Sequence, residues 1–168
     1  MTGYRHDLGR IVRVGDEEVV RIERDFAATP AEIWRMLTEP TRLAIWLQAV
    51  VDLDPQPGGA ITLRFGSTGT TIHGEIVQID APRVLEYTWR LADEPSSLVR
   101  FELYPTAARA VTRLRLTHSR CGEYAPSLFA AGWHHHLELF AAQLAGEAVA
   151  WDWDRYREVF AQYGAAVA

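Results

Sequence analysis

Residues 26–46 constrain the fold of this chain more than any other stretch, because they predict a strand that runs into a capped helix and then into a second, short helix. Thr29 is placed to be the N-cap, since its hydroxyl group can accept a hydrogen bond from a free backbone N–H of the first turn. Pro30 suits the first helical position, and Glu32 completes a capping box. Local chemistry therefore fixes the start of the helical segment, and Trp46 ends it.

Apolar side chains gather on one side of each of these two helices. They are Ile33, Trp34 and Leu37 in the first helix and, after Pro40 and Thr41, Leu43, Ile45 and Trp46 in the second. Two tryptophans on two short helices need a large apolar surface to pack against. The rest of the chain is expected to supply it as a run of strands followed by one long amphipathic helix.

Alternation of apolar and polar residues dominates from the first strand to His118, which predicts an antiparallel meander after the helical crossover. A two-residue turn, Gly15-Asp16, is expected to join Arg10–Val14 to the strand that ends at Phe26. The later strands are expected at Val50–Leu53, Ala60–Phe65, Thr71–Ile79, Val84–Trp89, Leu98–Tyr104 and Val111–His118. Gly74 indicates a bulge, which leaves the facing of His73 open.

Arg24 breaks the apolar parity of its strand, and two interpretations stay open. The first pairs it with a carboxylate near the strand end, and the second places it on a cavity floor in contact with an anionic ligand. Arg113 and Arg115, in contrast, alternate with leucines and are expected on the solvent face of the sheet.

A long helix is predicted from Pro126 or Ser127 to Leu144, with Gly146 at the position of a C-terminal cap. One apolar stripe runs along it and is expected to pack on the concave side of the sheet. The stripe consists of Phe129, Trp133, His136, Leu137, Phe140 and Leu144, while His134, Glu138 and Ala145 lie opposite. His134 is therefore expected to face solvent.

Several short blocks along the chain resemble one known superfamily. They are Pro30–Trp34, Leu37-Thr38-Glu39-Pro40, Leu43, Trp46, Pro57-Gly58-Gly59, Gly74 before Val77, Leu85 with Trp89, His118-Ser119 and Ala131-Gly132-Trp133-His134. Their order and spacing are similar to those of the bacterial START-like (SRPBCC) superfamily, and in particular to its Aha1-domain branch, named after the Hsp90 ATPase activator. The resemblance implies an α+β helix-grip fold, in which a curved antiparallel sheet wraps around a long C-terminal helix and two short helices follow the first strand.

The chain divides into a single START-like helix-grip domain, expected over residues 1–146, and an aromatic C-terminal extension over residues 147–168. With 168 residues, of which 48% are hydrophobic, the chain is long enough for one substantial core. Trp151, Trp153 and Phe160 are expected to be largely buried, because three exposed large rings would form an unusual apolar patch. The extension packs either on the domain itself or on a second subunit of a homodimer.

Composition excludes several functional classes. The net charge of −5 and the scattered arginines do not form the basic patch of a nucleic-acid binder, and the chain has no lysine for Schiff-base chemistry. Cys121 is the only cysteine, so an intramolecular disulfide is excluded. Met1–Asp7 has no apolar core of a signal peptide and no run is long enough to span a membrane, so a cytoplasmic protein is expected.

Three consecutive histidines, His134, His135 and His136, do not predict a metal site. Neighbouring side chains on a helix diverge by about 100°, whereas metal-binding helices place ligands four residues apart. Only His136 enters the apolar stripe. No metal and no cofactor are expected. His118 has the inward parity of its strand, where it is either a core histidine bonded to a backbone carbonyl or a contact to a ligand.

The predicted functional site is an apolar cavity between the sheet and the long helix, on the order of 300 to 1,000 Å³. Its candidate ligand-binding residues are Trp34, Trp46, Phe65, Trp89, Phe101, His118, Phe129, Trp133 and His136.

Three hypotheses follow from this site and from the resemblance. The first is non-enzymatic binding of a small hydrophobic or aromatic ligand. The second is a cyclase or hydratase type of enzyme that uses His118 or His136 as acid or base. The third, implied only by the resemblance, is a chaperone-interaction (Hsp90-type) module with a role in stress response. No nucleophile motif or phosphate loop is present, so no catalytic residue is assigned.

Overall fold

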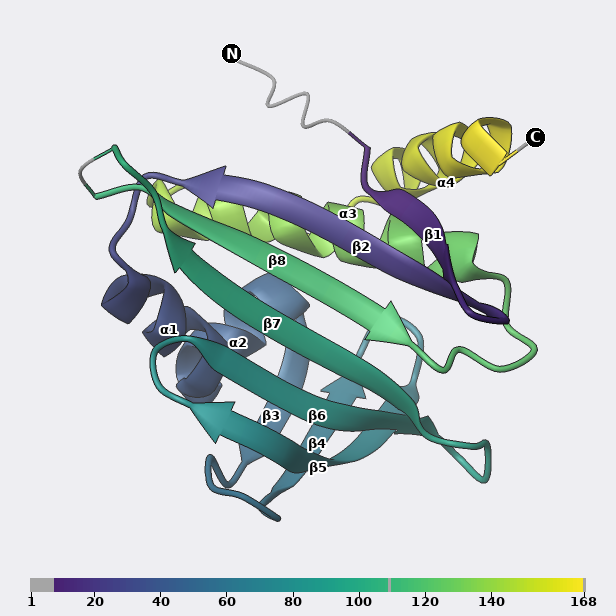
Figure 1. Ribbon diagram of the computed structural model, residues 1–168, viewed down its shortest axis with the longest axis horizontal. Coiled ribbons are helices and arrows are strands. Elements are labelled where there is room, and N and C mark those ends of the chain that lie inside the picture. Colours follow the sequence, from purple (N-terminus) through teal and green to yellow (C-terminus); the bar gives the residue numbers. More distant parts are fainter. Residues whose placement is uncertain (1–7, 109, 168) are drawn as a thin grey trace.

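The computed structural model of the protein describes residues 8–108 and 110–167, so Met1–Asp7 lie outside the described residues. Within these ranges the chain forms eight strands and four helices (Figure 1). In chain order they are β1 (Arg10–Val14), β2 (Glu17–Phe26), α1 (Pro30–Thr38), α2 (Pro40–Leu47), β3 (Ala49–Leu53), β4 (Ala60–Phe65), β5 (Thr70–Asp80), β6 (Val84–Leu91), β7 (Ser97–Pro105), β8 (Thr112–Ser119), α3 (Pro126–Leu144) and α4 (Trp153–Val167).

All the strands belong to one antiparallel sheet with the order β1-β2-β8-β7-β6-β5-β4-β3. The helices α1 and α2 make the crossover that carries the chain from β2 to β3, at the far edge of the sheet. The sheet curves around α3, and α4 lies on α3 beside β1 (Figure 1). The predicted α+β architecture, a curved antiparallel sheet around a long helix, is confirmed.

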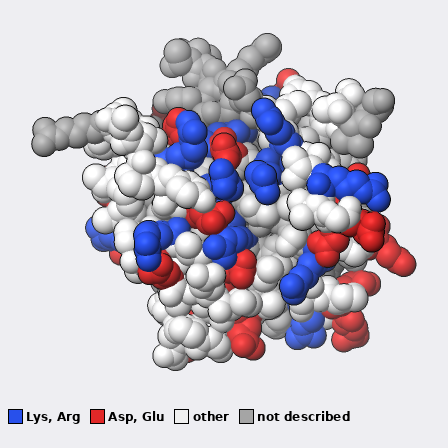
Figure 2. All heavy atoms as spheres, viewed as in Figure 1, with Lys and Arg blue, Asp and Glu red and all other residues white. Residues whose placement is uncertain are grey.

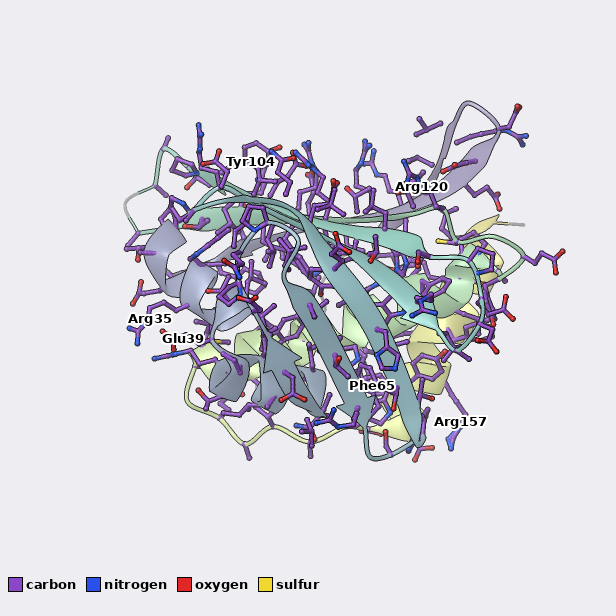
Figure 3. All side chains as sticks on the ribbon, turned by 90° about the horizontal axis from the view of Figure 1, so that it is seen from below. Arg35, Glu39, Phe65, Tyr104, Arg120 and Arg157 are labelled. Carbon is purple, nitrogen blue, oxygen red and sulfur yellow. The ribbon has the colours of Figure 1, made fainter. Side chains whose placement is uncertain are left out.

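The capping interactions predicted at the start of α1 are present in the structure. The Thr29 hydroxyl accepts from the backbone N–H of Glu32, and the Glu32 carboxylate accepts from the backbone N–H of Thr29, so the capping box is complete. At the other end of α1, Arg35 pairs with Glu39 on the surface, at one end of the molecule (Figure 3). The residue that ends α2, Gln48, adopts a left-handed conformation.

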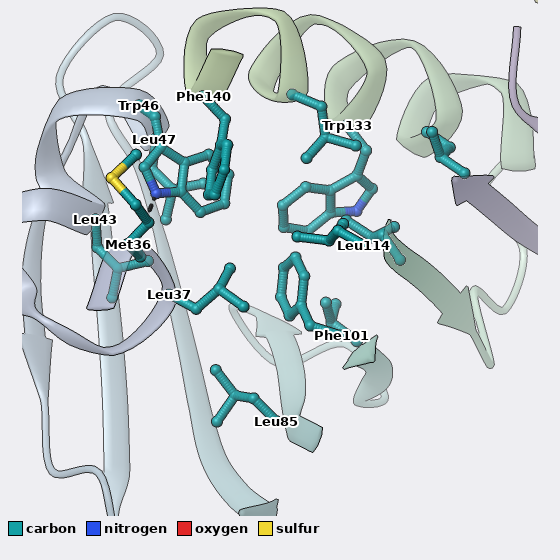
Figure 4. Packing of buried hydrophobic residues seen from close by; sticks show 14 of the residues in the cluster. Met36, Leu37, Leu43, Trp46, Leu47, Leu85, Phe101, Leu114, Trp133 and Phe140 are labelled. Atoms are coloured by element: carbon teal, nitrogen blue, oxygen red, sulfur yellow. Dashed lines mark hydrogen bonds between the residues drawn. The ribbon is translucent and has the colours of Figure 1, made fainter. Parts of the chain in front are cut away.

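The core lies between the sheet, α3 and the two short helices (Figure 4). Trp46 is fully buried, and its indole N–H donates to the carbonyl oxygen of Met36 at 3.0 Å. Phe140 of α3 packs against both Trp46 and Phe26 with ring centroids 5.2 and 4.8 Å apart. Helix α3 is therefore held on its inner side by rings from α2 and from the sheet.

The irregularity in β5 lies elsewhere than predicted. The pairing of β5 with β6 shifts between Ile76 and Gln78, whereas Gly74 continues the regular pairing of β4 with β5. A Cβ atom at position 74 would collide with the carbonyl oxygen of Thr88, which explains the glycine there. His73 is exposed.

Two predictions about facing are wrong, and both concern α4. His134 is buried, because α4 covers the side of α3 that the stripe left to solvent. Trp153 and Phe160 are 43% and 37% exposed, while Val159 and Tyr163 are fully buried among the described side chains of α4. Helix α4 lies on α3 with Val159 and Tyr163 turned inward, whereas the face with Trp153 and Phe160 is partly exposed.

The outer face of the sheet carries arginine and carboxylate side chains side by side (Figure 2). Arg113 binds Asp25 through two hydrogen bonds, and Arg115 binds Glu23, across the pairing of β2 with β8. These arginines lie on the solvent face, as predicted, and exposed pairs of this kind add little stability.

Candidate ligand-binding site

Eight of the nine predicted site residues form one network of ring contacts between the sheet and α3. They are Trp46, Phe65, Trp89, Phe101, His118, Phe129, Trp133 and His136. Trp34 is half-buried and makes no ring contact with them in the part of the chain that the structure describes. Eight of the nine residues predicted from the sequence therefore lie in one network, and Trp34 lies outside it.

The middle of this network is packed solid. Trp46, Phe101 and Trp133 are buried, and Phe101 meets the other two edge to face at centroid distances of 6.5 and 5.9 Å. Their rings belong to the core shown in Figure 4. The space between sheet and helix is thus filled at its centre, and the free volume lies toward one end of the network.

Two cavities lie at that end, next to the turn between β4 and β5. The smaller has a volume of about 240 Å³ and the larger about 440 Å³, and four residues, Thr70, Trp89, Leu91 and Phe129, line both. The smaller is also lined by Leu47, Gln48, Phe65, Ser67, Thr68, Ile72, His136, Trp151 and Trp153. The larger continues to Glu94, Pro95, Ser97, Cys121, Tyr124, Leu128 and Tyr156. We call the two together the aromatic groove.

Four of the predicted residues, Phe65, Trp89, Phe129 and His136, line the aromatic groove. Phe65 comes from the end of β4 (Figure 3), and its ring lies 6.2 Å from Trp89 and 6.1 Å from His136, centroid to centroid. Exposed Ser67 and Thr68 form the rim at the β4–β5 turn, so the groove opens to solvent there.

His118 lies behind the groove in a directed chain of hydrogen bonds. Its Nδ1 accepts from the indole N–H of Trp133 at 2.9 Å, which leaves the proton of the neutral imidazole on Nε2. Nε2 in turn donates to Oγ of Ser97 at 2.7 Å, and that hydroxyl donates to the carbonyl oxygen of Trp89 at 3.0 Å. Side chains, and not a backbone carbonyl, therefore satisfy His118.

This chain of bonds decides what His118 can do. His118 itself does not line the groove, and the nitrogen that faces the Ser97 hydroxyl already carries a proton, so His118 is not placed to act as a base on that hydroxyl group. Burial also lowers the pKa of His118 to about 3, so the ring stays neutral near pH 7. The arrangement is that of a structural histidine.

His136 differs because part of it faces the smaller cavity. Its Nδ1 donates to the carbonyl oxygen of Trp46 at 3.1 Å, so Nε2 of the neutral ring is an acceptor. Desolvation lowers the pKa of His136 to about 4, against the opposing effect of the bond to Trp46. The described residues of the cavity wall thus include one neutral imidazole.

Trp151 closes the groove on the side of α4 and was not among the predicted site residues. Its ring lies 4.8 Å from His136, 4.5 Å from His135 and 5.5 Å from Trp153, centroid to centroid. It precedes α4 and so has no helical periodicity to show which way it faces. Its position after Gly146, where the chain turns back over α3, was the only signal available in the sequence.

The buried histidines on the other side of α3 hold α4 in place. His135 donates from Nδ1 to Glu138 at 2.9 Å and accepts the backbone N–H of Asp152 on Nε2 at 3.1 Å. Arg155 of α4 donates from Nη2 to the same Glu138 carboxylate at 2.6 Å. Bonds from the histidines and Arg155 hold the pKa of Glu138 below its usual range, although burial alone would raise it.

Arg24 and His134 extend this network to the edge of the sheet. The Arg24 guanidinium and the Tyr163 hydroxyl each lie 3.2 Å from Nδ1 of His134, and the Tyr163 hydroxyl accepts the backbone N–H of Gly9 at 2.7 Å. Arg24 thus joins β2 to α3 through His134, and it does not line the aromatic groove.

The run of three histidines therefore divides into two functions, since His134 and His135 fasten α4 and His136 faces the groove. Among the described residues, no group of three or more histidine, cysteine or acidic side chains is arranged to hold a metal ion. None of the described helices combines the length and the apolar character needed to cross a membrane.

A curved antiparallel sheet, a long helix in its concave face and an apolar groove at one end of that helix define a START-like helix-grip domain. Within that class, residues 27–145 match the model of the family described as Activator of Hsp90 ATPase homolog 1-like protein, and the chain belongs to this family.

Solved structures share the fold over most of the chain. CalU16 from Micromonospora echinospora is 22% identical with a TM-score of 0.76, over 95% of this chain and 94% of that one. A protein from Bordetella parapertussis is 30% identical with a TM-score of 0.72, over 87% and 84%. An Hsp90 activator from Plasmodium falciparum is 19% identical with a TM-score of 0.66, over 76% and 96%. No curated protein sequence matches the chain.

Proposed function

We propose that this protein binds a small hydrophobic or aromatic molecule in the aromatic groove without changing it chemically. The observation that carries the proposal is the wall of the smaller cavity, in which Phe65, Trp89, Phe129 and Trp151 surround a single imidazole. Ligand sites of this kind are concave and mostly apolar, with a few polar groups that orient the ligand.

The polar content of the groove favours binding over catalysis. Acid–base chemistry needs groups that converge on one reacting atom, with pKa values near the working pH. Among the described residues, His136 is the one imidazole that lines the smaller cavity, its pKa is lowered to about 4, and His118 lies behind Ser97 with its bonds already made. A cyclase or hydratase reaction is therefore the weaker candidate.

Titration with uncharged aromatic molecules such as naphthalene and indole tests the proposal. Binding is measured by isothermal calorimetry and by tryptophan fluorescence. Trp89 and Trp151 lie in the wall, so a bound ring is expected to quench part of the emission. A ligand at a hundred times its Kd stabilises the folded state by about 2.7 kcal/mol, which a melting experiment detects.

A matched pair of variants shows whether binding occurs in the groove. Thr70 lines both cavities, whereas Thr71 follows it on β5 and points to the opposite side of the sheet. Thr70→Tyr is expected to weaken binding by about tenfold or more because the larger ring fills the groove, and Thr71→Tyr is expected to have no effect. Equal effects of both substitutions, or no binding at all, would contradict the proposal.

A second candidate is the interaction of this domain with an Hsp90-type chaperone, and it is favoured by the family to which residues 27–145 belong. The ATPase rate of Hsp90 with and without the protein tests it. If the Thr70→Tyr variant still stimulates the ATPase of Hsp90, the interaction does not depend on the groove.

A further inference from the structure

The acceptor nitrogen of His136 is the starting point for an inference that rests on the proposed function. Nδ1 of this ring is committed to the carbonyl oxygen of Trp46, which fixes the tautomer. Nε2 therefore presents a lone pair, and it has no hydrogen-bond partner within residues 8–108 and 110–167. The ring lines the smaller cavity, so a bound molecule can reach it.

The wall around this nitrogen carries no charge. The described residues that line the smaller cavity are apolar or neutral polar, and the charged residue on the wall of the larger cavity is Glu94, an acid. An ionised carboxylate or phosphate in the groove would lose its hydration without gaining a cation in return, and it would face the lone pair of His136.

The ring of Trp151 also lines the smaller cavity. The indole nitrogen of Trp151 is buried and has no hydrogen-bond partner in the described part of the chain. That N–H is enclosed, so the group offered to a ligand is the accepting nitrogen of His136, to which a hydroxyl group can donate.

We propose that the ligand of the aromatic groove is an uncharged aromatic hydroxyl compound, such as a phenol or an enol, and that His136 selects it by accepting the hydroxyl hydrogen on Nε2. A neutral imidazole is required for this contact. The lowered pKa of His136 keeps the ring neutral throughout the physiological range.

Four probes of nearly equal shape test this inference at neutral pH by isothermal calorimetry: 1-naphthol, 1-methoxynaphthalene, naphthalene and 1-naphthoate. We expect 1-naphthol to bind about three- to tenfold more tightly than the methoxy compound and the hydrocarbon, as one net hydrogen bond provides. Naphthoate is expected to bind most weakly. The ¹⁵N resonance of His136 Nε2 is expected to shift with 1-naphthol and not with 1-methoxynaphthalene.

Variants assign the preference to the imidazole. His136→Phe is expected to keep binding of naphthalene and to lose the preference for 1-naphthol, while His73→Phe, at an exposed position on β5, is expected to leave both unchanged. If a variant fails to fold, the comparison of the four probes on the unmodified protein still tests the inference.

The outcomes separate the inference from the proposed function. Equal affinities for 1-naphthol and 1-methoxynaphthalene, or tighter binding of naphthoate, would overturn the selection by His136 and leave the groove a binding site. Binding of none of the four probes would overturn the proposed function and the inference with it.

Discussion

The indole N–H of Trp133 donates to Nδ1 of His118 at 2.9 Å, and this bond joins the long helix α3 to strand β8 at the back of the aromatic groove. Both side chains are almost completely buried. Since the bond fixes the tautomer of His118, it also fixes the direction of the hydrogen bonds to Ser97 and Trp89. A single contact thereby sets the polar geometry behind the ligand site.

Removal of His118 is expected to lower stability substantially. His118→Phe leaves the buried Trp133 N–H and the Ser97 hydroxyl without this partner, so we expect a loss of about 2–3 kcal/mol in the free energy of unfolding. Urea denaturation of His118→Phe, Trp133→Phe and the double variant measures it. If the two single effects simply add in the double variant, the two side chains are not coupled as described.

Stability is expected to fall as the pH is lowered from 6.5 toward 4.5. The pKa of His118 is about 3 and that of His136 about 4 in the folded protein, against about 6.5 when unfolded, so the unfolded chain binds more protons in this window. Their contribution is complete above pH 6.5 and is lost as the pH falls. A buried imidazole accounts for about 2 kcal/mol between pH 6.5 and pH 5.

Urea denaturation at pH 7.5 and pH 5 tests this dependence. The difference between the two conditions is expected to shrink in His118→Gln, since that variant has one buried imidazole fewer. Identical stability of the unmodified protein at both pH values would show that the two rings are not held neutral. Carboxylates such as Glu138, with an ordinary pKa of about 4.5, lose only about 0.2 kcal/mol each by pH 5, so the imidazoles dominate the comparison.

Glu138 is expected to be the main polar anchor of α4. Glu138→Gln removes the negative charge that accepts bonds from His135 and Arg155, and we expect a loss of about 2–3 kcal/mol. Glu158 binds the same Arg155 but is 57% exposed, so Glu158→Gln is the matched control, with an expected loss of under about 0.5 kcal/mol. Thermal denaturation compares the two, and equal losses would contradict the assignment.

The adjacent residues Val159 and Phe160 test which face of α4 is docked. Val159 is fully buried and Phe160 is 37% exposed, so Val159→Ala is expected to be the more destabilising change, by about 1–2 kcal/mol, although it removes fewer atoms. The reverse order would mean that the aromatic face of α4 is the docked one.

Truncation after Gly146 removes all of these contacts and is expected to lower the melting temperature or the solubility. An unchanged melting temperature and association state would show that the extension is dispensable.

Local signals in the sequence predicted the fold well. The capping box of Thr29 and Glu32 depends on neighbouring atoms only, and the bounds of α3 agree with those expected from its apolar stripe and the position of Gly146. Alternation located the strands to within one or two residues, because each face of the sheet has a consistent environment along a strand.

Features that depend on packing between distant segments were not predictable. The stripe on α3 identified one buried side, but His134 is buried on the other side by a helix whose docking position no local pattern reveals. The cluster of rings was predictable, because the alternation along each strand and the apolar stripe of α3 showed which rings face inward. Which rings would fill the core, as Trp46 and Phe101 do, and which would line free space depends on how their shapes fit together.

The most direct test of the binding site is a ¹H–¹⁵N NMR titration of the uniformly labelled protein with 1-naphthol, observed at the assigned indole N–H resonances. Trp89 and Trp151 lie in the groove, whereas Trp46 is bonded to Met36 in the core and Trp34 packs against the core without lining the groove. We predict saturable shifts of the Trp89 and Trp151 signals, while those of Trp34 and Trp46 remain in place. Shifts confined to Trp34 or Trp46, or no saturable shift at any indole, would contradict the account.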